Sequence, residues 1–246
     1  MSQDSHHRLV VALDGPGSSG KSSVGAAAAL RLGYRFSDTG LLYRALTWLA
    51  LHRGVALDAA PELVALVPEV ELAPDAQGRL DRVRVDGVDV TRHVHSADVD
   101  RRVSELSRVP EVRAALVPRQ RDLVAGGGII MAGRDIGTVI LPAADLKIYL
   151  DASIEERAAR RSEERGVNPA SPAGEAILAE LRRRDGIDSG RPVAPMRAAV
   201  DARIVRTDGN SFEETVDAVT DLIAAAEQAA ESRPRQPTST ASRARG

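Results

Sequence analysis

Short apolar runs alternate along the chain with longer stretches that have the composition of helices. The strand-like runs are residues 9–13, 129–131, 146–150 and 202–205, and the helical stretches are residues 22–32, 153–164 and 212–227. Short, mostly apolar runs are typical of strands buried in a parallel sheet. Their alternation with helices predicts an α/β fold in which helices cover both faces of a parallel sheet.

The pattern changes between about residues 61 and 100, where apolar and polar positions alternate. Segments 70–72, 82–85 and 88–90 show this alternation, and Asp86-Gly87 lies between the last two as a hairpin-turn pair. The region predicts a small antiparallel β insertion. A helix is expected at about 112–124, with Pro118 either bending it or lying in its first turn.

A second irregular region covers residues 165–191. It is charged, contains Pro169 and Pro172, and is bounded by glycines. A short helix at 176–184 is expected within it. This composition suits a mobile lid.

The segment Gly15-Pro16-Gly17-Ser18-Ser19-Gly20-Lys21-Ser22 fits the phosphate-binding pattern GxxxxGK[ST]. It follows a strand-like run and precedes a helical stretch, as a phosphate loop (P-loop) requires. Lys21 is expected to reach the β- and γ-phosphates of a nucleotide, and the Ser22 hydroxyl to bind Mg²⁺. The only other lysine is Lys147, so a lysine here stands out in a chain that otherwise uses arginine. An ordinary glycine-rich turn is the alternative interpretation.

Arginines are dense beside turn-forming residues in the segment 182–191. Such density suits two anionic substrates, because guanidinium groups bind phosphates with paired hydrogen bonds. Segments 39–44 and 133–138 each combine glycine with arginine and with Asp or Thr, which favours a ligand crevice at the carboxyl ends of the strands. Arg157, Arg160 and Arg161 could instead form a solvated helix face.

Composition narrows the function classes. The 246 residues are 43% hydrophobic and carry a formal net charge of -2, so no global basic field favours nucleic acids or membranes. The chain has no cysteine, which excludes disulfides and suits the cytoplasm. No apolar stretch approaches the roughly 18 residues of a membrane span. Residues 231–246 are expected to form a disordered basic tail.

Neither a Ser-His-Asp set nor a metal-ligand spacing is found in the sequence. The bound nucleotide could donate a phosphoryl group to a second molecule. If the group that accepts it is itself a phosphate, whose second pKa is about 6, that group is already nucleophilic at neutral pH. No general base is then needed, and alignment with electrostatic stabilisation would supply the catalysis.

Several separated motifs, in this order, resemble the bacterial cytidylate kinase family, whose members transfer a phosphoryl group from ATP to CMP or dCMP. The resemblance runs from about residue 9 to residue 226. The motifs that carry it are residues 14–22, 38–44, 112–113, 119–121, 133–139, 150–153, 155–158 and 184–185, with Asp188-Ser189 and Arg191.

The resemblance implies a P-loop nucleoside monophosphate kinase fold with Mg²⁺ as cofactor and a cytoplasmic monomer. Its expected parts are a core (1–37, 111–155 and 192–230), a monophosphate-binding region (38–110) and a lid (156–191). The expected ATP-binding residues are Gly15, Pro16, Gly17, Ser18, Ser19, Gly20, Lys21, Ser22 and Ser23. The expected CMP-binding residues are Thr39, Tyr43, Arg44, Ser104, Arg113, Arg134, Asp135, Arg184, Asp188 and Arg191. The expected catalytic residues are Lys21, Arg134, Arg157, Arg161 and Arg191.

Within this set, Asp135 would accept a hydrogen bond from the exocyclic amine of cytosine. Uracil has a carbonyl there, and leaving the buried carboxylate unpaired costs about 1–3 kcal/mol. The resemblance leaves open which of Arg157, Arg160 and Arg161 contacts ATP.

Other interpretations remain open from the residues alone. The same loop could serve a kinase whose acceptor is UMP, dTMP or a small metabolite. A GTP-binding switch would need an Asn-Lys-x-Asp element, but neither Asn168 nor Asn210 precedes a lysine. Nucleic-acid binding has only the arginine-rich segments and the tail in its favour, since aromatic residues for base stacking are only 2% of the chain.

Overall fold

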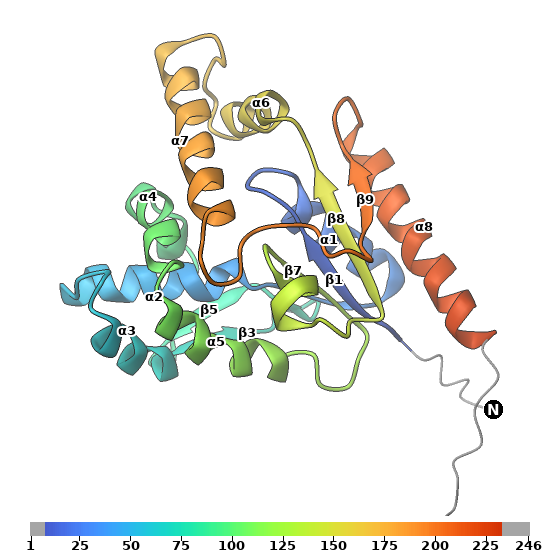
Figure 1. Cartoon of the computed structure of the whole chain (residues 1–246), viewed down its shortest axis with the longest axis horizontal. Helices are drawn as coiled ribbons and strands as arrows, with labels where there is room; N and C mark the ends of the chain where they lie inside the picture. Colours follow the sequence, from blue (N-terminus) through green and yellow to red (C-terminus); the bar gives the residue numbers. More distant parts are fainter. Residues whose placement is uncertain (1–7, 233–246) are drawn as a thin grey trace, which may run out of the picture.

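The computed structural model describes residues 8–232 and is built around a six-stranded sheet (Figure 1). The strand order is β4-β2-β7-β1-β8-β9, and every neighbouring pair is parallel. The strands are β1 (Val10–Asp14), β2 (Arg35–Asp38), β4 (Arg79–Leu80), β7 (Ile129–Gly133), β8 (Leu146–Asp151) and β9 (Arg203–Arg206). Their carboxyl ends therefore share one edge of the sheet, where a ligand is expected.

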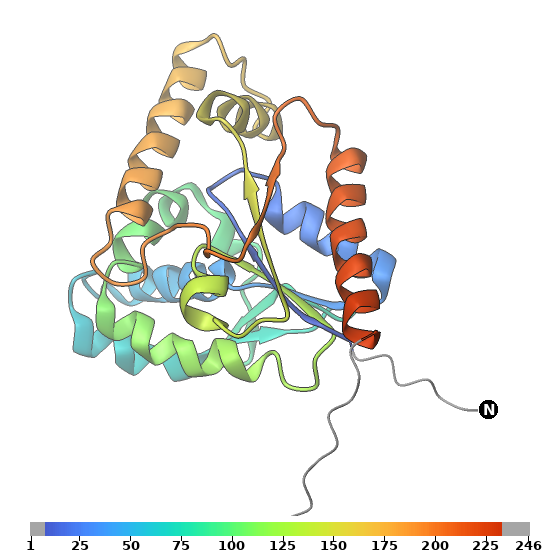
Figure 2. The same ribbon diagram turned by 45° about the vertical axis from the view of Figure 1, so that its right-hand side comes forward.

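Helices cover both faces of this sheet, as the sequence predicts (Figure 2). On one face, α1 (Lys21–Leu32) and α8 (Phe212–Glu231) pack on residues such as Val11 and Leu13. On the other face, α5 (Pro110–Asp122) and the π-helical turn η3 (Ile136–Ile140) pack near Ala12 and Met131. Helix α5 begins two residues before its predicted start, because Pro110 opens its first turn, and Pro118 lies in its interior.

The predicted antiparallel insertion is confirmed. Strands β3 (Val70–Ala73), β5 (Arg82–Val85) and β6 (Val88–Asp89) form a separate antiparallel sheet. Asp86 and Gly87 have φ values of 49° and 78°, as a two-residue hairpin turn requires. A second apolar core lies between this sheet and the helices α2 (Gly40–Arg53), α3 (Ala60–Leu66) and α4 (Ala97–Leu106). Two short 3₁₀ turns complete the region: η1 (Val67–Glu69) follows α3, and η2 (His93–His95) precedes α4.

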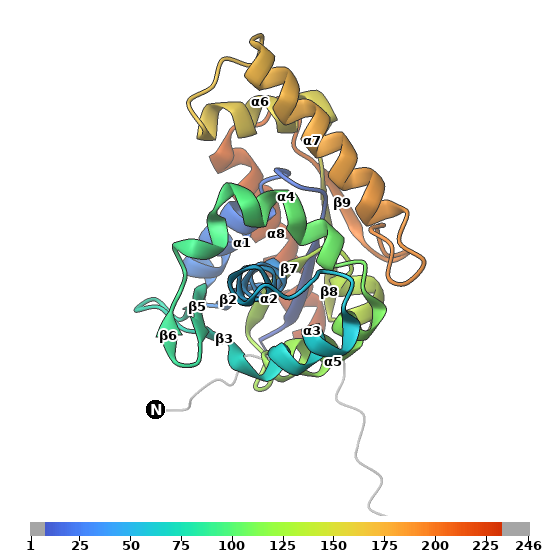
Figure 3. The same ribbon diagram turned by 90° about the vertical axis from the view of Figure 1, so that its left-hand side faces the viewer.

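Two helices, α6 (Ile154–Glu164) and α7 (Pro172–Ser189), lie beyond the carboxyl edge of the sheet (Figure 3). The helix predicted at 176–184 is present, but it extends further at both ends. Pro172 begins the helix instead of breaking it, and the Ser171 hydroxyl accepts a hydrogen bond from the Gly174 N–H at 3.3 Å as the N-cap. Asp185 and Gly186, which are among the turn-forming residues of segment 182–191, lie inside α7.

The chain ends are described only in part. Of the predicted disordered tail, Glu231 ends α8, whereas residues from 233 onward lie outside the described residues. Within residues 8–232, no helix combines the length and apolar character needed to cross a membrane.

Asp14 links the end of β1 to η3. Its carboxylate accepts hydrogen bonds from the backbone N–H groups of Ile136 at 2.8 Å and Gly137 at 2.7 Å. The segment that carries Arg134 and Asp135 is thereby fixed to the strand that leads into the P-loop. Burial raises the pKa of Asp14 to about 6, although the two N–H groups oppose this shift.

We expect Gly25→Val to lower the free energy of unfolding by about 1–3 kcal/mol, because α1 packs tightly on the sheet at this position. A Cβ at Gly25 would lie 2.7 Å from side-chain atoms of both Leu13 and Phe36. Leu30→Val places the same β-branched residue on an exposed face of α1 and should change stability by less than about 0.5 kcal/mol. Equal losses in urea denaturation would show that the packing explanation is wrong.

The buried Asp14 carboxyl should make stability depend on pH. Its pKa is about 6 in the folded chain against an ordinary value of 3.8, so the folded state binds more protons between these values. The stabilisation is fully present below pH about 4 and is lost as pH rises through about 6, a total of about 3 kcal/mol. The free energy of unfolding of the parent, minus that of Asp14→Asn, should therefore fall between about pH 3.5 and 6.5 and be level above about pH 7. A difference independent of pH would contradict this.

Candidate active site

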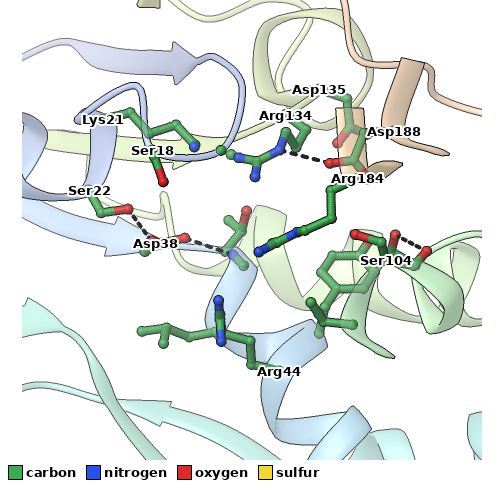
Figure 4. Close-up of a pocket in the computed structure, with 18 of the residues that line it drawn as sticks. Ser18, Lys21, Ser22, Asp38, Arg44, Ser104, Arg134, Asp135, Arg184 and Asp188 are labelled. Atoms are coloured by element: carbon green, nitrogen blue, oxygen red, sulfur yellow. Dashed lines mark hydrogen bonds and ion pairs between the residues drawn. The ribbon is translucent and has the colours of Figure 1, made fainter. Parts of the chain in front are cut away.

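A cavity of about 350 Å³ opens at the carboxyl ends of the central strands, between the P-loop, α2, α4 and the lid helices. Most of the expected site residues come together there from distant parts of the sequence (Figure 4). Those that line it are Gly17, Ser18, Gly20, Lys21, Ser22, Ser23, Thr39, Tyr43, Arg44, Ser104, Arg113, Arg134, Asp135, Arg161, Arg184, Asp188 and Arg191.

The other expected site residues, Gly15, Pro16, Ser19 and Arg157, are not among the residues that line this cavity. Two of them accept hydrogen bonds from cationic side chains through their backbone carbonyls. The Gly15 carbonyl accepts from Arg134 Nη1 at 3.1 Å, and the Pro16 carbonyl accepts from Lys21 Nζ at 2.9 Å. Gly15 also allows a close approach that no side chain could share, since a Cβ there would lie 2.3 Å from the Leu150 carbonyl oxygen.

Positive charge is in excess around the cavity. Its lining includes seven cationic side chains (Lys21, Arg44, Arg113, Arg134, Arg161, Arg184 and Arg191) and four carboxylates (Asp38, Asp135, Glu164 and Asp188), which leaves three formal positive charges. Figure 4 shows several of these cations converging on one space. An anionic ligand would relieve this imbalance.

The pKa values report the same imbalance. Burial first, and then the nearby Arg134 guanidinium, hold the pKa of Lys21 well below its usual range. Burial, with Arg134 and Arg44, lowers the pKa of Arg184 to about 10. The Asp188 carboxylate offsets part of the positive charge, because its Oδ2 accepts from Arg134 Nε at 3.1 Å. The Asp188 backbone carbonyl also accepts from Arg191 Nε at 3.1 Å.

A buried ion pair lies at the other end of the cavity. Arg113 Nη2 donates to Asp135 Oδ2, and the two residues are only 3% and 6% exposed. Arg113 Nη1 also donates to the Ser107 carbonyl at 3.4 Å, and its guanidinium carbon lies 5.5 Å from the centre of the Tyr43 ring. The pair presents donors and an acceptor in a fixed plane, which suits recognition of a planar polar group.

Three arginines that line the cavity each have a buried nitrogen without a hydrogen-bond acceptor among residues 8–232. Arg113 Nε, Arg184 Nε and Arg191 Nη2 are buried and make no hydrogen bond within the described part of the chain. Buried donors are normally satisfied.

Asp38 has no role assigned from the sequence, yet it faces Ser22. Its Oδ2 accepts from the Ser22 hydroxyl, and its Oδ1 accepts from the Gly40 N–H at 2.9 Å. Its position at the carboxyl end of β2 is the signal that could have identified it. The other lining residues without an assigned role are Gly40, Leu41, His95, Val103, Ser107, Gly133 and Glu164.

The three arginines on α6 have three different environments. Arg157 is buried, and its Nη1 donates to the Gly17 carbonyl of the P-loop at 3.1 Å. Arg160 Nη1 donates to the Thr207 hydroxyl at 2.9 Å, in the loop after β9. Arg161 lines the cavity. Arg157 and Arg160 are not among the residues that line it.

Most of the chain is similar to known proteins. The family model for cytidylate kinase matches residues 11–225. A cytidylate kinase of a Geobacillus species is 45% identical over 219 residues, which cover 88% of this chain and 97% of that protein. For an Exiguobacterium species the identity is 44%, covering 87% and 96%, and for Nocardia farcinica it is 43%, covering 91% and 96%. The matches span the P-loop, the β insertion and the lid, and the chain therefore belongs to the cytidylate kinase family.

Proposed function

We propose that this cavity transfers the γ-phosphoryl group of ATP to the phosphate of CMP or dCMP, giving ADP and CDP or dCDP. The observation that carries the proposal is the excess of three positive charges beside the buried Arg113–Asp135 pair. The charge suits two phosphate chains, and the pair suits one base. Membership of the cytidylate kinase family supports the same substrates.

The donor end is the P-loop. Gly20 has φ of 90°, a left-handed conformation that lets the loop curl into the start of α1, where a phosphate is favoured. Lys21 would bind the β- and γ-phosphates. The hydroxyl of Ser22 and the carboxylate of Asp38 are adjacent hard oxygen ligands, as Mg²⁺ prefers. When bound there with ATP, Mg²⁺ would neutralise charge on the transferred phosphate.

The acceptor end lies between α2, α4, α7 and the segment after β7. Arg44 and Arg134, with the Thr39 hydroxyl, would hold the acceptor phosphate. Thr39 is itself fixed, because its hydroxyl donates to the Ala132 carbonyl at 3.0 Å. Arg184 and Asp188 would contact the sugar, and a contact set that does not depend on the 2′-hydroxyl would accept dCMP.

Arg113, Asp135 and Ser104 would read the cytosine. The carboxylate of Asp135 accepts from the exocyclic amine, and Arg113 donates to the ring nitrogen and carbonyl. Since uracil presents a carbonyl in place of the amine, its oxygen would face the carboxylate oxygen. The unpaired acceptor costs about 1–3 kcal/mol, which favours cytosine.

Positioning and charge stabilisation would supply the catalysis, because the acceptor phosphate needs no base. Lys21, Arg134, Arg161 and Arg191 line the cavity and would stabilise the charge on the moving phosphoryl group. Arg157 would act differently, by holding the P-loop through the Gly17 carbonyl.

The proposal is tested by an ADP-release assay with ATP and Mg²⁺, in which CMP, dCMP, UMP, dTMP, AMP and GMP are offered separately. Strong turnover should be confined to CMP and dCMP. Lys21→Ala should lower kcat for both acceptors by about 100-fold or more. Turnover confined to another acceptor would keep the donor site but refute the base assignment, and a fully active Lys21→Ala enzyme would refute the donor site.

Asp135→Asn should reduce the preference for CMP over UMP by about fivefold or more, because an amide can donate to the uracil carbonyl. The measurement is the ratio of kcat/KM values for the two acceptors, with the KM for ATP as an internal check. Asp122→Asn, an exposed position on α5, is the matched control. A thermal unfolding scan identifies any loss that arises from the broken ion pair. An unchanged ratio in a folded variant would remove Asp135 from the base site.

A further inference from the structure

Asp100 of α4 is a buried carboxylate shared by arginines from two separate parts of the chain. Its Oδ1 accepts from Arg44 Nη2 of α2 at 2.6 Å, and its Oδ2 accepts from Arg165 Nη2 at the end of α6 at 3.0 Å. Arg161 Nη2 lies 3.6 Å from Oδ1. Burial opposes ionisation of Asp100, but Arg44 and the other arginines outweigh it and hold its pKa below the usual range.

The contact with Asp100 orients Arg44 without blocking it. Arg44 Nη1 donates to the Val94 carbonyl at 3.1 Å, while Nη2 donates to Asp100. A guanidinium group has five N–H donors, so three are left over from these two bonds. Arg44 also lines the cavity. Asp100 therefore holds the guanidinium group in place while leaving donors for a phosphate.

On the other side, Asp100 is where the lid meets the monophosphate-binding region. Figure 3 shows α4 lying between α2 and the lid helices α6 and α7. Arg165 does not line the cavity, and it also approaches Glu180 of α7 at 3.7 Å. Next to Asp100, the Arg101 carbonyl accepts from Arg183 Nη2 of α7 at 2.7 Å. Both lid helices thus contact α4 at residues 100 and 101.

The charges explain why a carboxylate is needed here. Arg44, Arg161 and Arg165 all face Asp100, and its carboxylate offsets part of their mutual repulsion. Without the carboxylate, three cationic groups would face each other, and the lid arginines would be repelled from Arg44. Asp100 is thus the group that makes contact between the lid and Arg44 favourable.

We propose that Asp100 is a positioning residue that couples closure of the lid to binding of the acceptor phosphate. This rests on the proposed function, because it takes Arg44 as a ligand of the CMP phosphate. Closure of the lid over ATP places Arg161 and Arg165 against Asp100, and Asp100 then holds Arg44 ready for the acceptor. By linkage, CMP bound at Arg44 favours the closed lid to the same extent.

The test is the dissociation constant of CMP, measured by calorimetry with and without a non-hydrolysable ATP analogue and Mg²⁺. In the parent, the analogue should tighten CMP binding by about fivefold or more, the lower end of ordinary coupling between sites. The ratio of the CMP dissociation constants without and with the analogue measures this coupling. Arg165→Gln should bring the ratio close to one, although Arg165 is not among the residues that line the cavity. Asp100→Asn should do the same, and the double variant should lose no more than either single variant.

Arg182→Gln is the matched control, since it removes the same charge from an exposed lid position where Arg182 pairs with Glu155 at 3.5 Å. It should keep the parent ratio, and Arg165→Lys should recover part of it. A parent ratio near one, or equal ratios in Arg165→Gln and Arg182→Gln, would refute the coupling while CMP phosphorylation stands. A parent that neither binds nor phosphorylates CMP would instead refute the proposed function, and this inference with it.

Discussion

Buried positive charge is the constraint on which the arrangement of this molecule depends. Two like charges 4 Å apart repel by about 4 kcal/mol at an effective dielectric constant of about 20. Lys21, Arg134 and Arg184 are nevertheless gathered at one cavity, and burial together with the Arg134 charge depresses the pKa values of the other two. Asp188 offsets only part of this charge. The groups that disfavour the empty cavity are therefore the groups that favour a cavity filled by phosphates.

The P-loop organises this charge through both sides of its backbone. A loop that turns its N–H groups toward phosphates must turn some of its carbonyls elsewhere. Those of Gly15, Pro16 and Gly17 accept from Arg134, Lys21 and Arg157 respectively. The arginines come from the segment after β7 and from the lid, so the loop also fixes the positions of these side chains. Arg157 thus contacts the P-loop without lining the cavity.

Features that depend on neighbours in sequence were predictable, and features that depend on distant partners were not. The P-loop and the Asp86-Gly87 hairpin are each determined by a pattern of consecutive residues, and both are confirmed. The sequence predicts too short a helix for α7, because a proline usually interrupts a helix. Pro172 instead begins α7, since Ser171 is the N-cap of the helix. The pairing of Asp38 with Ser22 joins residues 16 positions apart in the sequence, and only the folded chain shows it.

The lid arginines show how one rigid element can connect two substrate sites. Arg157, Arg161 and Arg165 are spaced by four residues, so they lie along one face of α6 and span about 12 Å from first to last. The first reaches the P-loop at Gly17, the second lines the cavity, and the third reaches Asp100 beside Arg44. A helix cannot shift at one end without shifting at the other, so α6 would adjust the proposed donor and acceptor sites together. A lid that closes fully only when both phosphate chains are in place also keeps water away from the γ-phosphate until the acceptor is present, which favours transfer over hydrolysis.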